Sequence, residues 1–348
     1  MDFARDETQE EVAGVAADLL GRGLDSDELW SALAGADLLS LALPERLGGS
    51  GLGVAEALTV LTEVGRAAAL VPALPTIGFG VLPVLALATE EQQDALLGEV
   101  ASGGVLTAAL AEPGRPFPQT PSATVVEVDG GIAVTGSFVA VPYADRAQSI
   151  LVPTNAGVVA VAPDADGVTL LESPTSAHTP EFSVRLESAV GTRLGGGDAA
   201  SDVQTLYSLA TTGIAAYSDG LLTGATELTA KHVSERHQFG KPLAAFQAVA
   251  QQIADVYVTA RTLHVAALST IWRISENLDA ADDLDVTAYW IAAELLPAMR
   301  VLHHLHGGIG VDETYPMHRY SSLAKDIARL LGGASYRLDL VGARCSSN

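Results

Sequence analysis

The chain has 348 residues, 48% of them hydrophobic, which is enough for two or three packed units and excludes a disordered polypeptide. Its formal net charge of −23 favours solubility and excludes nucleic acid and anionic membrane surfaces as expected partners, because both require clustered Lys and Arg. The one cysteine, Cys345, excludes an intrachain disulfide and a cysteine-based metal site.

The N-terminal part of the chain is predicted to be helical. Residues 1–7 are acidic and lack the apolar core of a signal peptide, and no later stretch resembles a membrane span of about 20 residues, so we expect a cytoplasmic protein. Asp6 is placed to cap a first helix, and apolar spacing predicts further helices at 54–68 and 90–97. We therefore expect an N-terminal helical domain over residues 1–103.

The pattern changes to short β-branched runs near Gly103. Asp129-Gly130 between two such runs is a strong hairpin signal. These runs predict a compact middle antiparallel β-domain over residues 104–197, ending in the glycine linker 195–197. The predicted strands are 105–111, 124–128, 132–141, 150–153, 158–161, 168–171 and 182–186.

The remainder of the chain, residues 198–348, returns to helical spacing. We expect four helices, which together predict a C-terminal four-helix bundle and an α+β fold with the order α, β, α. The predicted helices span 203–234, a segment starting near 243, 286–304 and 321–343.

A first candidate binding segment joins the first two of these helices. Arg236 lies at a helix end and can bind phosphate with its planar guanidinium, while Phe239-Gly240 forms a turn that lets the backbone approach a ligand. Gln247 follows in the next helix and can donate its side-chain amide. The alternative is an ordinary corner between two helices with a solvated arginine.

A second candidate segment is the glycine-rich turn that follows the third helix. Its backbone N–H groups could hold a pyrophosphate, but no strand precedes it, so it is neither a Rossmann nor a P-loop motif. Histidines precede the turn, yet no carboxylate stands at ligand spacing on the same helical face, so we expect no metal. The residues concerned are His303, His304, His306, Gly307, Gly308 and Gly310.

Together these segments resemble the acyl-CoA dehydrogenase family. Residues 235–247 are similar to its Arg-x-x-Phe-Gly signature with the following Phe-Gln, and residues 307–319 to its Gly-Gly-x-Gly and Tyr-Pro signature. Residues 44–51 and 110–114 resemble its N-terminal loop and its Thr-Glu-Pro-Gly turn. The resemblance covers nearly the whole chain. It implies the acyl-CoA dehydrogenase fold and an FAD-dependent reaction in which a carboxylate takes the α-proton of an acyl-CoA.

The residues of the reactive centre depart from the family pattern. Gly332 stands where the catalytic Glu is usual, and residues 209–213, the alternative position of the base, contain no acid. The stretches 109–112 and 138–141 lack the hydroxyl side chains that usually meet the flavin ring. We therefore expect no catalytic residue in this chain. Candidates for a relocated base are Glu112, Asp219, Glu227, Glu235 and Glu313.

The side of the FAD site that holds ADP is better preserved. In the family each FAD lies across a subunit interface, and the neighbouring subunit contacts the pyrophosphate and adenosine. The resemblance therefore implies that this chain gives half of the site to a homologous partner that carries the catalytic Glu. The matching residues are Arg236, Gln238, Phe239, Gly240, Gln247, Gly307, Gly308 and Gly310, with His304 in place of the usual Gln.

This arrangement resembles the subunit without a base in actinobacterial heterotetrameric (α2β2) acyl-CoA dehydrogenases of steroid (cholesterol) side-chain degradation. It implies an acyl-CoA substrate held mainly by the partner, two FAD per tetramer, and an electron-transfer flavoprotein as a candidate acceptor. Two alternatives stay open: a self-sufficient homo-oligomeric dehydrogenase with a relocated base, and a non-catalytic scaffold subunit.

Overall fold

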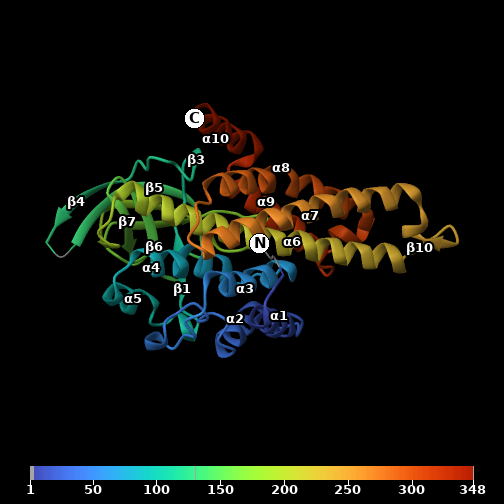
Figure 1. Cartoon of the computed structure of the whole chain (residues 1–348), viewed down its shortest axis with the longest axis horizontal. Helices are drawn as coiled ribbons and strands as arrows, with labels where there is room; N and C mark the ends of the chain where they lie inside the picture. Colours follow the sequence, from blue (N-terminus) through green and yellow to red (C-terminus); the bar gives the residue numbers. More distant parts are fainter. Residues whose placement is uncertain (1–3, 130, 348) are drawn as a thin grey trace. The chain divides into compact units, whose positions relative to one another are not determined.

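A computed structural model describes residues 4–129 and 131–347, with helices in the N- and C-terminal parts and strands between them (Figure 1). The α+β class and the order α, β, α are thus confirmed. The chain divides into two compact units, one formed by Arg5–Leu61 with Leu70–Ile214, the other mainly by Thr62–Ala69 with Ala215–Asn348. The domain boundaries expected from the sequence stay a prediction. No described helix is both long and apolar enough to cross a bilayer.

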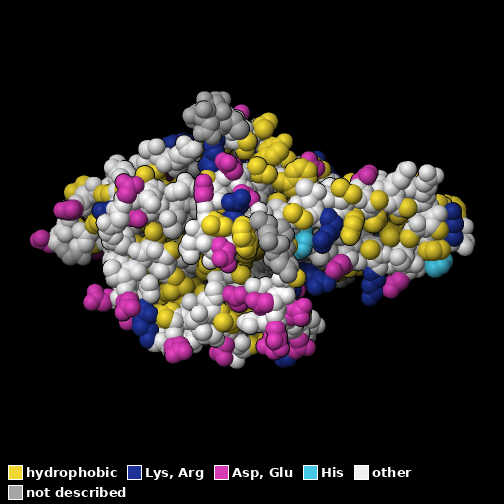
Figure 2. Space-filling model, in the orientation of Figure 1, with side chains coloured by type: hydrophobic (Ala, Val, Ile, Leu, Met, Phe, Trp, Pro, Cys, Tyr) yellow, Lys and Arg dark blue, Asp and Glu magenta, His cyan; other side chains and the backbone are white. Residues whose placement is uncertain are grey.

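The first two helices are fixed by acidic caps. Asp6 accepts a hydrogen bond from the backbone of Gln9 at the start of α1 (Glu7–Leu20), and Asp25 forms a capping box at the start of α2 (Ser26–Gly35). Figure 2 shows Asp and Glu side chains gathered over these two helices. The N-terminal helices therefore carry part of the large negative charge of the chain.

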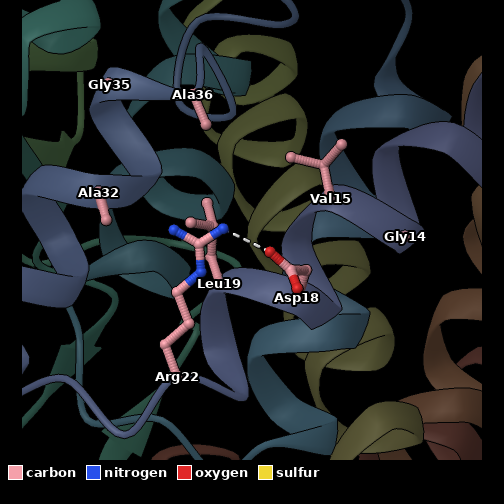
Figure 3. A pocket seen from close by; sticks show the side chains of 8 residues that line it. All are labelled: Gly14, Val15, Asp18, Leu19, Arg22, Ala32, Gly35 and Ala36. Carbon is pink, nitrogen blue, oxygen red and sulfur yellow. Dashed lines mark hydrogen bonds and ion pairs between the residues drawn. The ribbon is translucent and has the colours of Figure 1, made fainter.

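A hollow of about 730 Å³ lies between α1 and α2 (Figure 3). Small residues such as Gly14, Ala32 and Gly35 line it, and the exposed pair Asp18–Arg22 lies at its side with an oxygen–nitrogen distance of 2.5 Å. Both charged groups of the hollow are satisfied by each other, so it is a surface groove between two helices rather than a polar binding site.

The next helices of the N-terminal part are α3 (Val54–Arg66), a π-helix (η2, Leu74–Val81), α4 (Leu82–Leu87) and α5 (Glu90–Leu97). The predicted helices at 54–68 and 90–97 are confirmed within two residues. The buried π-helix was not predicted individually, because its Pro- and Gly-containing apolar run has no helical periodicity.

The sheet has the strand order β1-β6-β7-β9-β5-β2-β3, with β4 on β5 and β8 on β9. All its pairs are antiparallel except β1 with β6, which is parallel and differs from the prediction. The long connection between β1 and β6 lets the two strands run in the same direction, whereas a tight hairpin would make them antiparallel. The bounds are β1 (Val105–Ala108), β2 (Ala111–Glu112), β3 (Arg115–Pro116), β4 (Thr124–Val128), β5 (Gly131–Pro142), β6 (Ala147–Thr154), β7 (Gly157–Val161), β8 (Val168–Glu172) and β9 (Glu181–Arg193).

The C-terminal part is helical, as predicted, with five helices among the described residues. Helix α8 packs against α7, α9 and α10. The single helix predicted over 321–343 is instead two helices, because Gly332 and Gly333 adopt left-handed φ values of 85° and 80° between them. The bounds are α6 (Ala199–Glu235), α7 (Gln247–Ser275), α8 (Ala281–His306), α9 (Met317–Leu330) and α10 (Gly333–Ser347).

Three glycines allow the backbones of α3 and α6 to touch, and we call them the glycine seam: Gly65, Gly220 and Gly224. A Cβ atom at Gly65 would overlap the carbonyl oxygen of Tyr217, and one at Gly220 would overlap that of Thr62. Gly224 meets the backbone of the same α3 segment. The seam therefore requires glycine, and it holds Thr62–Ala69 in the same unit as the C-terminal helices.

Candidate functional site

The two sequence segments singled out above meet where α6 and α8 end. The imidazole of His232, in the last turn of α6, stacks on that of His306, the last residue of α8, with ring centroids 4.6 Å apart. The ring of Tyr315 lies 5.2 Å from that of His306 and 6.3 Å from that of His232. This aromatic cluster places the residues after His232 beside the glycine turn after His306. His232 was not singled out in the sequence.

The aromatic cluster is uncharged at neutral pH. His306 is 5% exposed and its Nδ1 donates to the carbonyl oxygen of Leu302 at 2.9 Å. Burial lowers the pKa of His306, and burial together with the nearby Arg236 lowers the pKa of His232. Both imidazoles are therefore neutral near pH 7, which permits the two rings to stack without repulsion.

The segment after α6 is a tight hairpin of β10 (His237–Gln238) and β11 (Lys241–Pro242) at the tip of α6 (Figure 1). Its turn residues Phe239 and Gly240 have φ values of 52° and 80°. Two left-handed residues are the requirement of a type I′ turn, which explains Gly240 and leaves Phe239 in a conformation rare for a bulky side chain.

The hairpin presents an aromatic surface to solvent. Phe239 is 92% exposed, and its ring meets that of Phe246 edge-on with centroids 6.3 Å apart. The Nζ atom of Lys241 lies 4.2 Å from the centroid of the Phe246 ring. An almost fully exposed phenylalanine at a strained turn position is typical of a residue that packs against another molecule.

Arg236 and Gln247 lie at the base of the same hairpin, and both are exposed. The carbonyl of Arg236 accepts from the Leu243 amide at 2.8 Å, which fixes its backbone. Within the part of the chain that the structure describes, its guanidinium makes neither a hydrogen bond nor an ion pair. Gln247 is the first residue of α7, at the positive end of the helix dipole. An unpaired guanidinium and a helix N-terminus, both at the base of one hairpin, suit an anionic ligand.

The three glycines of the second motif have three different explanations. Gly307 adopts φ 60° and ψ −140°, a backbone conformation that favours glycine. Gly310 is required by packing, since a Cβ atom there would lie 2.9 Å from Cδ2 of His303. Gly308 has no left-handed φ, and a Cβ atom there would meet nothing within 4 Å. The missing side chain at Gly308 therefore leaves open space beside the backbone, as a pyrophosphate requires.

The stretches that would meet a flavin ring are instead part of the core of the sheet. Ala109, Phe138 and Val141 are each at most 1% exposed and belong to one hydrophobic cluster. Leu110 and Ala140 are buried as well. These side chains fit packing within the chain and offer no hydroxyl to a ring, whereas the segments at the ends of α6 and α8 have exposed side chains and open backbone.

Two of the acids considered as a relocated base are buried and already paired. Glu112 forms an ion pair with Arg115 at 3.1 Å and accepts from the Ser122 amide at 2.5 Å. Asp219 on α6 pairs with Nδ1 of His264 on α7 at 2.9 Å. Both carboxylates therefore have structural partners, although one oxygen of Asp219, Oδ1, is buried without a hydrogen bond among the described residues.

The other positions considered for the base are less suited to it. Glu227 is exposed and binds Arg66 through both of its oxygens, at 2.8 and 3.0 Å. Glu235 and Glu313 are exposed. Gly332, where the family base is usual, has φ 85°, a conformation that a glutamate rarely adopts.

Comparison with known proteins agrees with the resemblance along the chain. Residues 1–104 match the N-terminal domain of acyl-CoA dehydrogenase, and residues 204–344 match its C-terminal domain. The acyl-CoA dehydrogenase FadE28 of Mycobacterium tuberculosis is 48% identical over 348 residues, covering 99% of both chains.

Solved structures share the whole fold. A variant of the Tcur3481–Tcur3483 steroid ACAD has a TM-score of 0.90 at 32% identity, covering 98% of this chain and 99% of that chain. The ChsE4–ChsE5 complex from Mycobacterium tuberculosis has a TM-score of 0.89 at 29% identity, with both chains covered completely.

The expected cofactor, FAD, is confirmed at the level of the family. Structures with this fold include PigA with FAD and a glutaryl-CoA dehydrogenase from Mycobacterium smegmatis in complex with FADH2. The two matched domains and the 48% identity to FadE28 show to which family the chain belongs. It belongs to the acyl-CoA dehydrogenase family.

Proposed function

We propose that this chain is one subunit of a heteromeric FAD-dependent acyl-CoA dehydrogenase, in which it holds the ADP half of each FAD that it shares. The proposal is supported by a contrast within the chain between the expected ADP side and the expected ring side of the FAD site. Arg236 and Gly308 are open to an external ligand, whereas the stretches 109–112 and 138–141 are packed into the core. A homologous partner supplies the ring pocket and the catalytic Glu.

Each residue of the half-site has a distinct role. Arg236 pairs with the pyrophosphate, the side-chain amide of Gln247 donates to it, and the open backbone at Gly308 lets it approach closely. Gln238, Phe239 and Gly240 belong to the hairpin that would hold the ADP group, and His304 would replace a glutamine donor with an imidazole. FAD would supply the acceptor for the β-hydrogen of the acyl-CoA, removed as hydride, and the partner's carboxylate would take the α-proton, so that an α,β double bond would remain.

The proposed assembly is an α2β2 heterotetramer with two FAD. The similarity to the ChsE4–ChsE5 complex and to a steroid ACAD supports a mixed assembly and a steroid side-chain CoA thioester as substrate. The substrate binds mainly on the partner, and an electron-transfer flavoprotein is the proposed electron acceptor. The proposed location is the cytoplasm.

The first test is co-expression with a homologue that carries the catalytic Glu. We expect a 2:2 complex with two FAD per tetramer that oxidises an acyl-CoA in the presence of an electron acceptor, and little flavin on this chain alone. Stoichiometric flavin and turnover by this chain alone would refute the proposal and favour a self-sufficient enzyme. A complex without FAD would favour a scaffold.

The second test is Arg236→Ala in that complex. Loss of a charge-assisted contact to phosphate is worth about 1.5–3 kcal/mol, so the Kd for FAD should rise roughly 10- to 150-fold. Arg185→Ala on β9, which removes an exposed arginine already paired with Glu187, is the matched control and should leave flavin content unchanged. Equal flavin content in both variants would remove Arg236 from the site.

A further inference from the structure

A cavity of about 370 Å³ lies between α8 and α9, in a chain whose net charge is −23. Leu296 and Met299 are its apolar lining residues, and Ser321 lines it as well. The other lining side chains are basic, and no acid lines the cavity. They are Arg300, His303, His304 and Lys325.

Arg300 and Lys325 have no partner of opposite charge among the described residues. Within residues 4–129 and 131–344, neither Arg300 nor Lys325 makes an ion pair or a side-chain hydrogen bond. Asp326 follows Lys325 in sequence, but its carboxylate lies near Arg329, with an oxygen–nitrogen distance of 3.8 Å. Arg300 and Lys325 are both exposed and both line the same hollow, and their positive charges favour occupation by an anion.

The wall of the cavity is fixed by a polar contact. Nδ1 of His303 lies 2.8 Å from Oγ of Ser321, which joins α8 to α9, and Gly310 packs closely against the same imidazole. Burial lowers the pKa of His303, and the charged groups that lower it further are Lys325 and His318, both basic. The arrangement is therefore ordered before a ligand binds, and its charged surroundings are positive.

We propose that this α8–α9 cavity binds a phosphate ester with an apolar or aromatic portion, at a site separate from the ADP half-site. Arg300 and Lys325 would hold the phosphate, with the Ser321 hydroxyl as a further hydrogen-bond partner. Leu296 and Met299 provide an apolar surface on which a base or an acyl group can lie. The volume is in the lower part of the range for small-molecule sites and exceeds what inorganic phosphate needs.

This ligand chemistry has two sources, the 3′-phosphorylated ADP end of a CoA thioester and a free adenine nucleotide. Adenosine 3′,5′-bisphosphate stands for the first source, ADP for the second, and inorganic phosphate for the bare anion. The inference does not rest on the proposed FAD half-site, since Arg300, Ser321 and Lys325 lie outside it. His304 alone borders both sites.

The test is isothermal titration of the full-length chain with each of these three compounds. We expect at least one ester to bind at least tenfold more tightly than inorganic phosphate, and the tighter ester identifies the source. Arg300→Gln and Lys325→Gln should each weaken that binding about tenfold or more. Lys231→Gln, which removes the same charge from an exposed position on α6, is the matched control and should leave it unchanged.

A further arm separates the cavity from the FAD site. Arg236→Ala should leave binding of the ester unchanged, and Lys325→Gln should leave the flavin content of the co-expressed complex unchanged. The absence of ester binding at millimolar concentration would overturn the inference. So would equal binding by the Lys325→Gln and Lys231→Gln variants at unchanged melting temperature, or loss of ester binding in Arg236→Ala.

Discussion

His232 and His306 stack their imidazoles with ring centroids 4.6 Å apart, and this contact joins the end of α6 to the end of α8. The contact has no polar component: Nδ1 of His306 is hydrogen-bonded to Leu302, and Nε2 has no partner among the described residues. The stack positions Arg236, one turn beyond His232, relative to the glycine turn that begins at Gly307.

Replacement of His306 by alanine should therefore affect both stability and cofactor binding. The ring is 5% exposed, so its removal leaves a cavity and should lower the free energy of unfolding by about 2–4 kcal/mol. FAD should also be retained less well in the complex, which denaturant unfolding and flavin absorbance will show. The control is His178→Asn, at an exposed position with φ 58° that asparagine tolerates, for which a change within about 0.5 kcal/mol is expected.

Stability should fall as the pH is lowered through 6.5. Both His232 and His306 have folded-state pKa values below the ordinary histidine value of 6.5, so below this pH the unfolded chain binds protons that the folded chain does not. Each histidine can contribute at most about 1.4 kcal/mol per pH unit over the range between its two pKa values. Unfolding at pH 7.5 and 5.5, compared between the wild type and His306→Ala, measures the effect. The prediction is contradicted if the free energy of unfolding of the wild type falls no more between these two pH values than that of the variant.

Insertion of the usual base should not create a dehydrogenase. Gly332→Glu forces a glutamate into a left-handed conformation with φ 85° and should cost about 1–2 kcal/mol of stability without acyl-CoA turnover by the chain alone. The control is Gly342→Glu, at an exposed position within α10 where a Cβ atom meets nothing within 4 Å. This substitution should raise the free energy of unfolding by about 0.5–1 kcal/mol. Turnover by Gly332→Glu alone would show that the chain holds a complete ring pocket.

The pair of Asp219 and His264 allows a test of the relocated base. Asp219→Asn keeps the shape of the side chain but removes its charge, so a structural pair predicts a loss of about 1–3 kcal/mol in the free energy of unfolding with normal turnover by the complex. A catalytic base predicts the reverse: loss of turnover with flavin content unchanged. Steady-state rates and denaturation of the same variant distinguish the two roles.

The sequence predicted elements where periodicity and turn chemistry agree. The helices after Asp6 and Thr89 follow local rules, and the antiparallel pairing of β4 with β5 confirms that the strands on either side of Asp129-Gly130 pair, although Gly130 itself lies outside the described residues. The parallel pair of β1 and β6 could not be predicted, because strand direction depends on contacts distant in sequence. The break at Gly332 is different, because Gly332-Gly333 is a sequence signal for the end of a helix that the prediction of one helix over 321–343 did not use.

For the candidate site, motif spacing indicated Arg236 and the glycine turn but not what joins them. The partner of His306 is His232, which belongs to a different helix and to no signature. Nor could the sequence distinguish the three glycines of the turn. Only the structure shows that Gly310 is required by its contact with His303, whereas the backbone at Gly308 borders open space.

The glycine seam has a consequence for synthesis of the chain. Thr62–Ala69 leaves the ribosome early, but the α6 backbone against which Gly65 packs begins with Ala215. At about 5–20 residues per second, the segment waits roughly 7–30 s for its partner. During that interval a surface shaped to receive another backbone is uncovered, so a pause in translation or a truncated message leaves the nascent chain exposed to aggregation or chaperone capture.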